Sequence, residues 1–188
     1  MNISWQDLNV LNTVNKPAGY LKMMSEVWGI KVRSIVEIGV FQGTTSEELK
    51  ILFPDAFLYL IDPWEMYEAY LSKEAGPISK NSADYESAYQ LVKKAFDQDP
   101  KVKIIRKTSL DALEDVPDEI DLVFIDGNHD YAHVKQDIEH WLPKIRSGGM
   151  ISGHDYRNEF PGVRKAVDAF FPEGVAIGSD HVWLRRVP

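Results

Sequence analysis

The strongest constraint on the fold is a regular alternation of short apolar runs with stretches of helical periodicity. The apolar runs have the composition of buried strands, and they are residues 34–38, 57–61, 102–105, 122–125 and 150–152. Between them, apolar residues recur at helical spacing, as at Val134, Ile138 and Trp141. Strands that alternate with helices form right-handed βαβ units. We therefore expect an α/β fold with a Rossmann-like, doubly wound, mostly parallel sheet.

The two ends of the chain depart from this alternation. Apolar residues at helical spacing precede the first strand, within an N-terminal helical segment that we place at 1–30. Near the other end, residues 175–177 and 181–184 flank a Gly-Ser-Asp turn, which is typical of an antiparallel hairpin. A capping box at residues 45–48 is expected to open the helix after the first strand. With 188 residues, the chain has the length of a single domain spanning 1–188.

One connection, residues 63–84, is too long for a simple turn between a strand and a helix. Loops longer than about 12–15 residues are often lids or binding loops. This one contains Trp64, Tyr67 and Tyr70, whose rings could stack on a sugar or an aromatic acceptor. We expect a lid with a short helix around residues 65–71. A disordered excursion is the alternative.

Charge and cysteine content narrow the classes of partner. The net charge of −8 disfavours phosphate backbones, so we expect no nucleic-acid partner. The chain has no cysteine, which excludes thiol nucleophiles and thiolate zinc sites and fits a reducing compartment. No apolar stretch approaches the roughly 20 residues that cross a bilayer, and the first residues do not resemble a signal peptide. These features predict a cytoplasmic protein without a membrane partner.

The candidate site lies where the strands end, because ligands of open parallel sheets bind outside the carboxyl ends of the strands. Four carboxylates occupy such positions: Glu37, Asp62, Asp126 and Asp155. Gly39 and Gly43 follow the first strand and permit a tight turn and close approach of a ligand to the backbone. A carboxylate at the position of Asp62 can accept both ribose hydroxyls of an adenosine. The alternative is that Asp62 caps a helix or a loop.

This concentration of carboxylates favours a cationic ligand, either a divalent metal or a sulfonium with an ammonium group. Asp126 and Asp155 end neighbouring strands and can converge on one ion, and His154 would make that site softer. His129 can act as a general base, because an imidazole pKa of about 6.5 lies close to working pH. The alternatives are structural: Asp126 or His129 caps the next helix, and Asp155 pairs with a lysine or arginine.

Four segments together resemble the class I S-adenosylmethionine-dependent methyltransferases. They are VEIGVFQGT (36–44), LIDPW (60–64), DLVFIDGNH (121–129) and GGMISGHDY (148–156). More narrowly, they resemble the family-24, macrocin-type O-methyltransferases, over about residues 30–187. The resemblance implies S-adenosylmethionine as cofactor, with Glu37 and Gly39 near its methionine moiety, Asp62 on its ribose and Ser109 near its adenine. The full predicted cofactor set is Glu37, Gly39, Gly43, Thr44, Asp62, Pro63, Ser109 and Asp126.

The same resemblance implies a metal site and a catalytic base. Asp126, His154 and Asp155 occupy the positions of the metal ligands, and His129 occupies that of the base. The family pattern has an acid or an amide where this chain has His154, so both Mg²⁺ and Mn²⁺ are candidates. Many small relatives pair up, which is compatible with a homodimer.

Three functions follow from these observations. The leading hypothesis is methyl transfer to a hydroxyl of a small molecule or sugar, assisted by a divalent metal. The chain lacks the Asn/Asp-Pro-Pro-aromatic motif of many amino-directed methyltransferases, which favours oxygen acceptors. A nicotinamide-dependent oxidoreductase is an alternative, although the third glycine is missing and the site is acidic. The other alternative is a non-catalytic nucleoside-binding module.

Overall fold

The computed structural model describes residues 15–66 and 81–188, and the described residues form a seven-stranded sheet. Its strands, in chain order, are β1 (Ser34–Ile38), β2 (Phe57–Ile61), β3 (Val102–Ile105), β4 (Ile120–Ile125), β5 (Ile145–Gly153), β6 (Ala176–Ile177) and β7 (Trp183–Arg186). The order across the sheet is β3-β2-β1-β4-β5-β7-β6. Strands β1 to β5 pair in parallel, and β7 pairs antiparallel with both β5 and β6. The predicted α/β fold with a C-terminal hairpin is confirmed.

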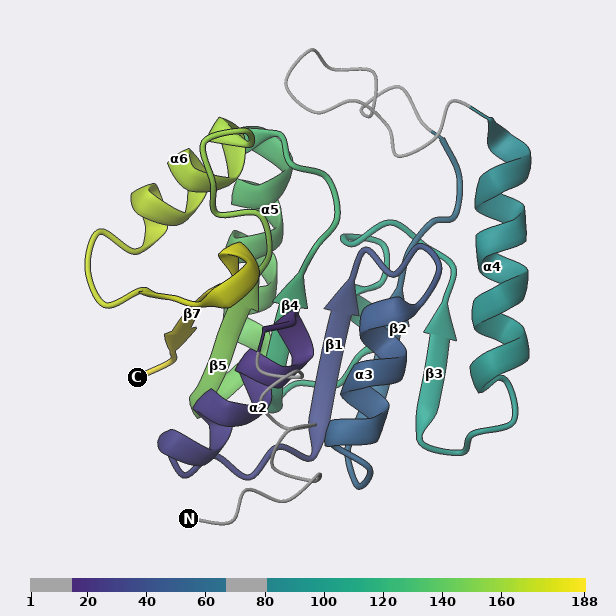
Figure 1. Ribbon diagram of the computed structural model, residues 1–188, viewed down its shortest axis with the longest axis horizontal. Helices are drawn as coiled ribbons and strands as arrows, with labels where there is room; N and C mark the ends of the chain where they lie inside the picture. Colours follow the sequence, from purple (N-terminus) through teal and green to yellow (C-terminus); the bar gives the residue numbers. More distant parts are fainter. Residues whose placement is uncertain (1–14, 67–80) are drawn as a thin grey trace.

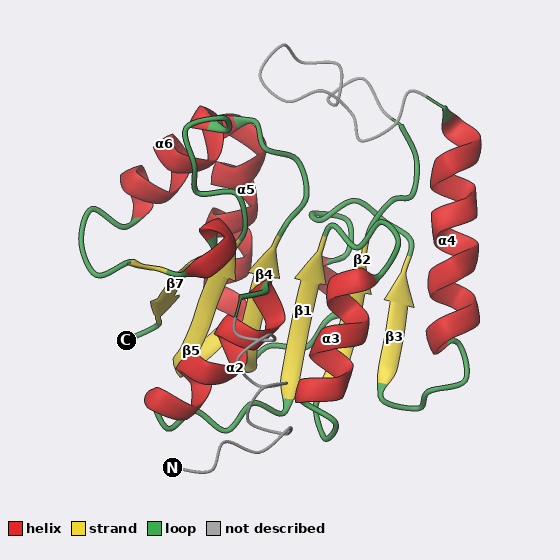
Figure 2. Cartoon of the chain, in the orientation of Figure 1, coloured by secondary structure: helices red, strands yellow, loops and turns green. Residues whose placement is uncertain are grey.

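Helices cover both faces of the sheet (Figures 1 and 2). One face packs against α2 (Pro17–Val27), α3 (Thr44–Leu52) and α4 (Ser82–Phe96), and the other against α5 (Tyr131–Trp141) and α6 (Pro161–Phe170). Three short 3-10 helices complete the described elements: η2 (Leu113–Asp115), η3 (Leu142–Lys144) and η4 (Ser179–His181). None of the helices in the described ranges has the length and hydrophobicity of a membrane span.

Strand β1 shows how the two apolar layers place a functional side chain. Ile35 packs in the layer under α2, α3 and α4, whereas Val36 and Ile38 pack in the layer under α5 and α6. Because side chains alternate along a strand, Glu37 points to the same side as Ile35. There it meets Ser46 of α3. The alternation thus buries a carboxylate at the end of an otherwise apolar strand.

The start of α3 differs from the expected capping box. The helix begins at Thr44, its N-cap is Gly43 in the left-handed conformation, and no side chain caps it. The hydroxyl of Ser46 instead donates to Glu37. A glycine with positive φ already turns the chain into the helix, so residues 45–48 are not needed to cap it.

Strand β5 is longer than the expected 150–152 segment. It begins at Ile145 and contains Gly149, whose pair with Gly148 would be expected to end a helix and not to lie in a strand. The register between β4 and β5 shifts between Ile120 and Leu122, and a Cβ on Gly149 would lie 2.9 Å from the carbonyl oxygen of Asp121. The glycine therefore marks a β-bulge with close strand approach.

Trp64 is not available to stack on an acceptor, contrary to the expectation for the long connection. Its side chain is 1% exposed, its Nε1 donates to the carbonyl oxygen of Phe41 at 2.7 Å, and its ring lies 5.1 Å from that of Tyr89. Helix α4 already begins at Ser82, so residues 82–84 are helical. Tyr67, Tyr70 and most of the short helix expected at 65–71 lie outside the described residues, and the lid stays a prediction.

The C-terminal hairpin supports the end of β5. Gly153 lies so close to β7 that a Cβ on it would be 2.7 Å from the ring of Trp183. Immediately after β5, the backbone N–H of Tyr156 donates to the carbonyl oxygen of His181 at 3.0 Å. The loop after β5 is therefore bound on one side to β4 and on the other to η4 and β7.

Candidate functional site

Two cavities open at the carboxyl ends of the parallel strands. The first, called here the acidic cavity, has a volume of about 340 Å³ and is lined by Glu37, Gly39, Thr44, Asp126, His129, His154 and Asp155, among others. The second, the apolar cavity, has a volume of about 220 Å³ and includes Ile38, Gly39, Ile61, Pro63, Ser109, Leu110 and Asp137 in its lining. The two share Gly39. Of the predicted set, Gly43 and Asp62 line neither of these two cavities, as far as the described residues show.

Gly39 is needed for the loops after β1 and β4 to meet. Its φ is +86°, and a Cβ at this position would lie 2.2 Å from the backbone oxygen of Asp126. Only glycine fits so close an approach without displacing the backbone of the second loop. Gly39 is predicted to lie beside a ligand, and it also has a structural role: it lets the loops after β1 and β4 touch at the point where the two cavities adjoin.

Glu37 is a buried carboxyl group at the base of the acidic cavity. It is 1% exposed, and Ser46 Oγ donates to its Oε2 at 2.5 Å. Burial raises the pKa of Glu37 to about 8; the Ser46 hydrogen bond opposes this rise, and Asp126 and Asp62 add to it. A cationic group in the cavity would favour the ionised form, so Glu37 suits a positively charged ligand.

Asp62 braces the loops around the site. Its Oδ2 accepts the backbone N–H groups of Val40 and Phe41 at 3.0 and 2.9 Å, and its Oδ1 accepts that of Trp64 at 2.6 Å. Burial raises the pKa of Asp62 in spite of these hydrogen bonds. The loop-capping alternative is therefore realised in the structure. Contact with a ribose stays a prediction.

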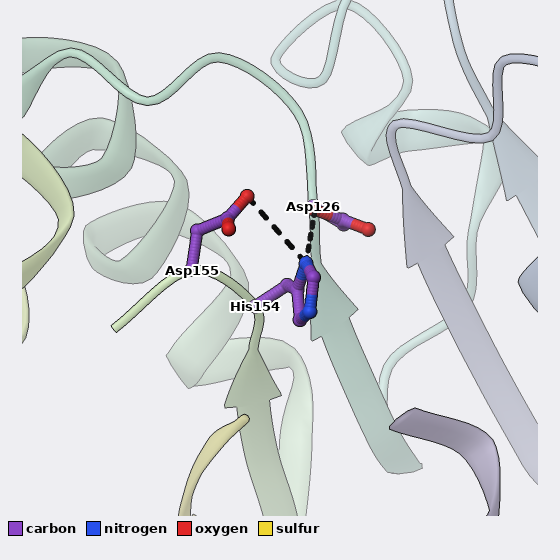
Figure 3. A group of neighbouring side chains, drawn as sticks. All are labelled: Asp126, His154 and Asp155. Carbon is purple, nitrogen blue, oxygen red and sulfur yellow. Dashed lines mark ion pairs between the residues drawn. The ribbon is translucent and has the colours of Figure 1, made fainter. Parts of the chain in front are cut away.

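Asp126, His154 and Asp155 come together at the ends of β4 and β5 (Figure 3). One potential ligand atom of each lies within 4.8 Å of the others, and His154 Nδ1 is 3.5 Å from both Asp126 Oδ1 and Asp155 Oδ2. Two carboxylates and an imidazole form a donor set that suits Mn²⁺, Fe²⁺ or Zn²⁺, and with added water also Mg²⁺. Geometry and chemistry of the three residues fit a divalent metal.

The charges within this cluster shift the pKa values of its members. Burial lowers the pKa of His154, but hydrogen bonds with Asp126 and Asp155 outweigh that effect and raise it to about 10. Burial likewise favours the neutral form of Asp155, but the hydrogen bonds from His129 and His154 hold its pKa well below its usual range. The imidazolium of His154 thus supplies positive charge between two carboxylates. A metal ion bound there would replace the proton on Nδ1.

Asp155 has two more partners. Arg157 Nη2 lies 2.9 Å from Oδ1, and His129 Nε2 lies 2.8 Å from Oδ2. The residue itself has a φ of +59°, a strained conformation for a side chain with a Cβ. Pairing of Asp155 with an arginine was one of the structural alternatives, and it occurs together with the cluster geometry.

His129 is held between Asp155 and α6. Its ring stacks on Phe160 with centroids 4.3 Å apart, and a Cβ on Gly162 would lie 2.4 Å from its carbonyl oxygen. A carboxylate that accepts the proton on one ring nitrogen leaves the other nitrogen basic. Asp155 is placed to orient His129 in this way. Phe160 and Gly162 give it its position, and neither was singled out from the sequence.

Two further carboxylates at the site were also missed. Asp180 Oδ2 lies 3.5 Å from His154 Nε2, on the side opposite the cluster. Asp137 lines the apolar cavity and is 6% exposed. Asp137 could have been found, because it falls within the apolar stripe of α5 formed by Val134, Ile138 and Trp141. A carboxyl group in such a stripe needs a partner or a ligand.

Comparison with known proteins gives a consistent result. Residues 36–156 match the family described as "Methyltransferase domain" (Methyltransf_24). Among curated proteins, the uncharacterized protein y4gI of Sinorhizobium fredii (strain NBRC 101917 / NGR234) is 41% identical over 54 residues, 28% of this chain. That match spans only 6% of the length of y4gI.

Several solved structures share the fold at low sequence identity. The O-methyltransferase NovP has a TM-score of 0.65 and 14% identity over 96% of this chain and 80% of its own. An O-methyltransferase from Bacillus cereus in complex with SAH has a TM-score of 0.58 and 18% identity, over 91% and 80%. A spermidine synthase from Thermotoga maritima also has a TM-score of 0.58, at 14% identity over 90% and 60%. The fold alone therefore does not specify which group is transferred.

Proposed function

The chain belongs to the methyltransferase-domain family, and from this premise we propose that it methylates a hydroxyl of a small molecule or sugar, with S-adenosylmethionine as donor and a divalent metal as helper. The observation that carries the proposal is the proximity of a metal-type cluster, Asp126, His154 and Asp155, to a histidine oriented by one of its members. A hydroxyl needs its proton removed before it can attack a methyl group. The acidic cavity combines the means to acidify a hydroxyl and to accept its proton.

In this proposal the cofactor spans both cavities. Its methionine end lies in the acidic cavity, where Glu37 accepts the ammonium group, and its adenine lies in the apolar cavity beside Pro63 and Ser109. Gly39, which lines both cavities, marks the crossing between the two parts. The sulfonium charge then lies among carboxylates, which offset its desolvation.

The acceptor is placed beside the metal ligands. Asp126, His154 and Asp155 would hold the ion, which when bound lowers the pKa of a coordinated hydroxyl. His129 takes the proton, and Asp155 keeps the imidazole in the orientation that leaves its second nitrogen basic. Phe160 covers one face of that ring and limits its rotation. Much of the rate enhancement comes from positioning of the acceptor oxygen against the methyl group.

The nicotinamide alternative is less well supported. Asp126 and Asp155 line the acidic cavity, and negative charge on them opposes a pyrophosphate. The non-catalytic alternative differs in turnover alone, since it predicts nucleoside binding without product. The homodimer, the cytoplasmic location and the absence of nucleic-acid and membrane partners remain predictions from the sequence.

The proposal is tested first by titration calorimetry with S-adenosylmethionine and S-adenosylhomocysteine. If neither compound binds, the cofactor assignment is contradicted. Methyl transfer is then measured on hydroxylated and amino acceptors with Mg²⁺ or Mn²⁺, for the wild type and for Asp126→Ala. Asp118→Ala is the matched control, since Asp118 is exposed and paired with Lys144. Transfer only to amino acceptors would overturn the assignment of an oxygen acceptor. Transfer that Asp126→Ala leaves unchanged would overturn the role of the metal.

A further inference from the structure

The apolar cavity contains a buried carboxyl group that the proposed reaction does not use. Its walls include the apolar side chains of Ile38, Ile61 and Leu110, at the ends of β1 and β2 and after β3. Among its lining residues, Asp137 is the carboxylic acid, and it is buried although the neighbouring Gln136 on α5 is exposed. Its placement on the inner face of α5 directs this group toward the sheet ends and away from water.

The hydrogen bonds around Asp137 have a fixed direction. The indole N–H of Trp141 can only donate, and Nε1 lies 2.8 Å from Ser109 Oγ. The Ser109 oxygen therefore accepts that hydrogen bond, and its own proton is free to be donated to Asp137, with which it is hydrogen-bonded. Asp137 is the accepting end of a chain that runs from Trp141 through Ser109.

Asp137, which accepts the last of these hydrogen bonds, can accept further hydrogen bonds from a ligand. A carboxylate can accept about four hydrogen bonds, and Ser109 supplies one. Burial raises the pKa of Asp137 to about 7, a change that the Ser109 hydrogen bond and His140 oppose. A carboxyl group with acceptor capacity at an apolar cavity is costly to keep unless a donor enters the cavity.

We propose that Asp137 accepts the exocyclic amine of the cofactor's adenine and so distinguishes adenine from purines that carry a carbonyl there. This inference rests on the proposed function, because it assumes that the adenine occupies the apolar cavity. A purine is a flat ring with polar edges, which fits a cavity with apolar walls at Ile38, Ile61 and Leu110 and a polar side that includes Asn128, Gln136 and Asp137. The amine of adenine is a donor, whereas the carbonyl of hypoxanthine is an acceptor and would face a second acceptor when Asp137 is ionised, so the comparison is made at a pH well above its pKa of about 7. Ser109 is then a positioning residue, which holds the carboxyl group at the rim of the ring.

The test compares two ligands on the full chain by titration calorimetry. One is S-adenosylhomocysteine, and the other is its inosine analogue, in which a carbonyl oxygen replaces the amine. The wild type is expected to bind the adenosine compound about tenfold or more tightly than the inosine compound, because the analogue leaves buried acceptors unpaired. In Asp137→Asn the ratio should fall to within about threefold, since an amide can both accept and donate.

The readout is the ratio of the two affinities, which a general loosening of α5 would not change. Glu139→Gln is the matched control, an exposed carboxylate on the same helix paired with Lys135, and it should keep the wild-type ratio. Equal binding of both compounds by the wild type would overturn the inference whether or not Asp137→Asn folds. An unchanged ratio in Asp137→Asn would also overturn it. If the wild type binds neither compound, it is the proposed function that fails.

Discussion

The imidazole of His129 and the carboxylate of Asp155 form a pair, with Nε2 2.8 Å from Oδ2, at the edge of the acidic cavity. Asp155 belongs at the same time to the cluster with Asp126 and His154. One carboxylate thus links the group that would remove a proton to the groups that would hold a metal. Substitution of His129 is expected to change turnover, and substitution of His154 is expected to change metal binding.

The first prediction concerns His129→Ala. Loss of a general base lowers rates by roughly 10²–10⁴-fold, so turnover should fall by that order while the affinity for S-adenosylhomocysteine stays close to wild type. Steady-state kinetics and calorimetry measure the two quantities. His140→Ala is the control, because His140 is exposed on α5 and contacts the carbonyl oxygen of Gln136. An unchanged turnover number would remove His129 from the reaction.

The second prediction concerns the metal preference set by His154. Replacement of an imidazole by a carboxylate in His154→Asp makes the donor set harder, so affinity should shift toward Mg²⁺ relative to Mn²⁺. Binding of Mn²⁺ is followed by its electron paramagnetic resonance signal, with Mg²⁺ as competitor. The same measurement on Asp180→Asn tests whether the carboxylate 3.5 Å from His154 Nε2 contributes through the imidazole. A preference for Mg²⁺ that is equal in wild type and His154→Asp would contradict a ligand role.

The third prediction concerns Glu37→Gln and the pH dependence of stability. The pKa of Glu37 is raised to about 8 in the folded chain from an ordinary value of 4.5. Its contribution to stability is therefore full below about 4.5 and is lost as the pH rises toward 8. Glutamine has no such loss, and its amide oxygen can still accept from Ser46.

The unfolding free energy of Glu37→Gln relative to wild type should therefore increase between pH 5 and pH 7.5, by up to about 3 kcal/mol. Urea denaturation at both pH values, without cofactor or metal, measures this difference. A difference that is the same at the two pH values would show that Glu37 does not take up a proton on folding.

The fourth prediction separates steric clash from backbone strain at two glycines. Gly29 and Gly39 both have positive φ, but a Cβ would meet nothing within 4 Å at Gly29, whereas at Gly39 it would lie 2.2 Å from the Asp126 oxygen. Gly29→Ala should cost about 1 kcal/mol of unfolding free energy, the strain of the left-handed conformation. Gly39→Ala should cost about 1–3 kcal/mol more, because it displaces the loop after β4. Equal losses in denaturation experiments would show that the two loops do not need their close approach.

Sequence patterns predicted the sheet well because buried strands and helical stripes are repeated signals. Strands β1, β2 and β3 coincide with the expected apolar runs, and β5 was cut short because Gly149 resembles a helix end until the bulge beside Asp121 is known. The capping box failed because Gly43 is the N-cap, so Thr45 lies within the helix, and Glu48 pairs with Lys16 instead. A local motif does not show a partner that comes from another part of the chain.

The site was predictable in its members but not in their contacts. The acidic cavity gathers most of the predicted residues, since the ends of parallel strands meet at one edge. The three backbone hydrogen bonds of Asp62 depend on the path of two loops, and the residue types in those loops do not predict that path. Asp137 was not singled out because the stripe formed by Val134, Ile138 and Trp141 was interpreted as core, without attention to the carboxyl group within it.

The family match ends at residue 156, yet the loop with His154 and Asp155 is held from outside that stretch, by Trp183 against Gly153 and by His181 on Tyr156. The matched region therefore contains only part of the scaffold of the residues proposed as metal ligands: β4 supports the loop from inside it, through Ile125, and the hairpin from outside. Two relatives with identical residues from 36 to 156 could therefore hold the side chains of His154 and Asp155 differently, if their C-terminal hairpins differ. Substitutions in the hairpin could therefore change the geometry of this loop, in evolution or by design, without a change to Asp126, His154 or Asp155.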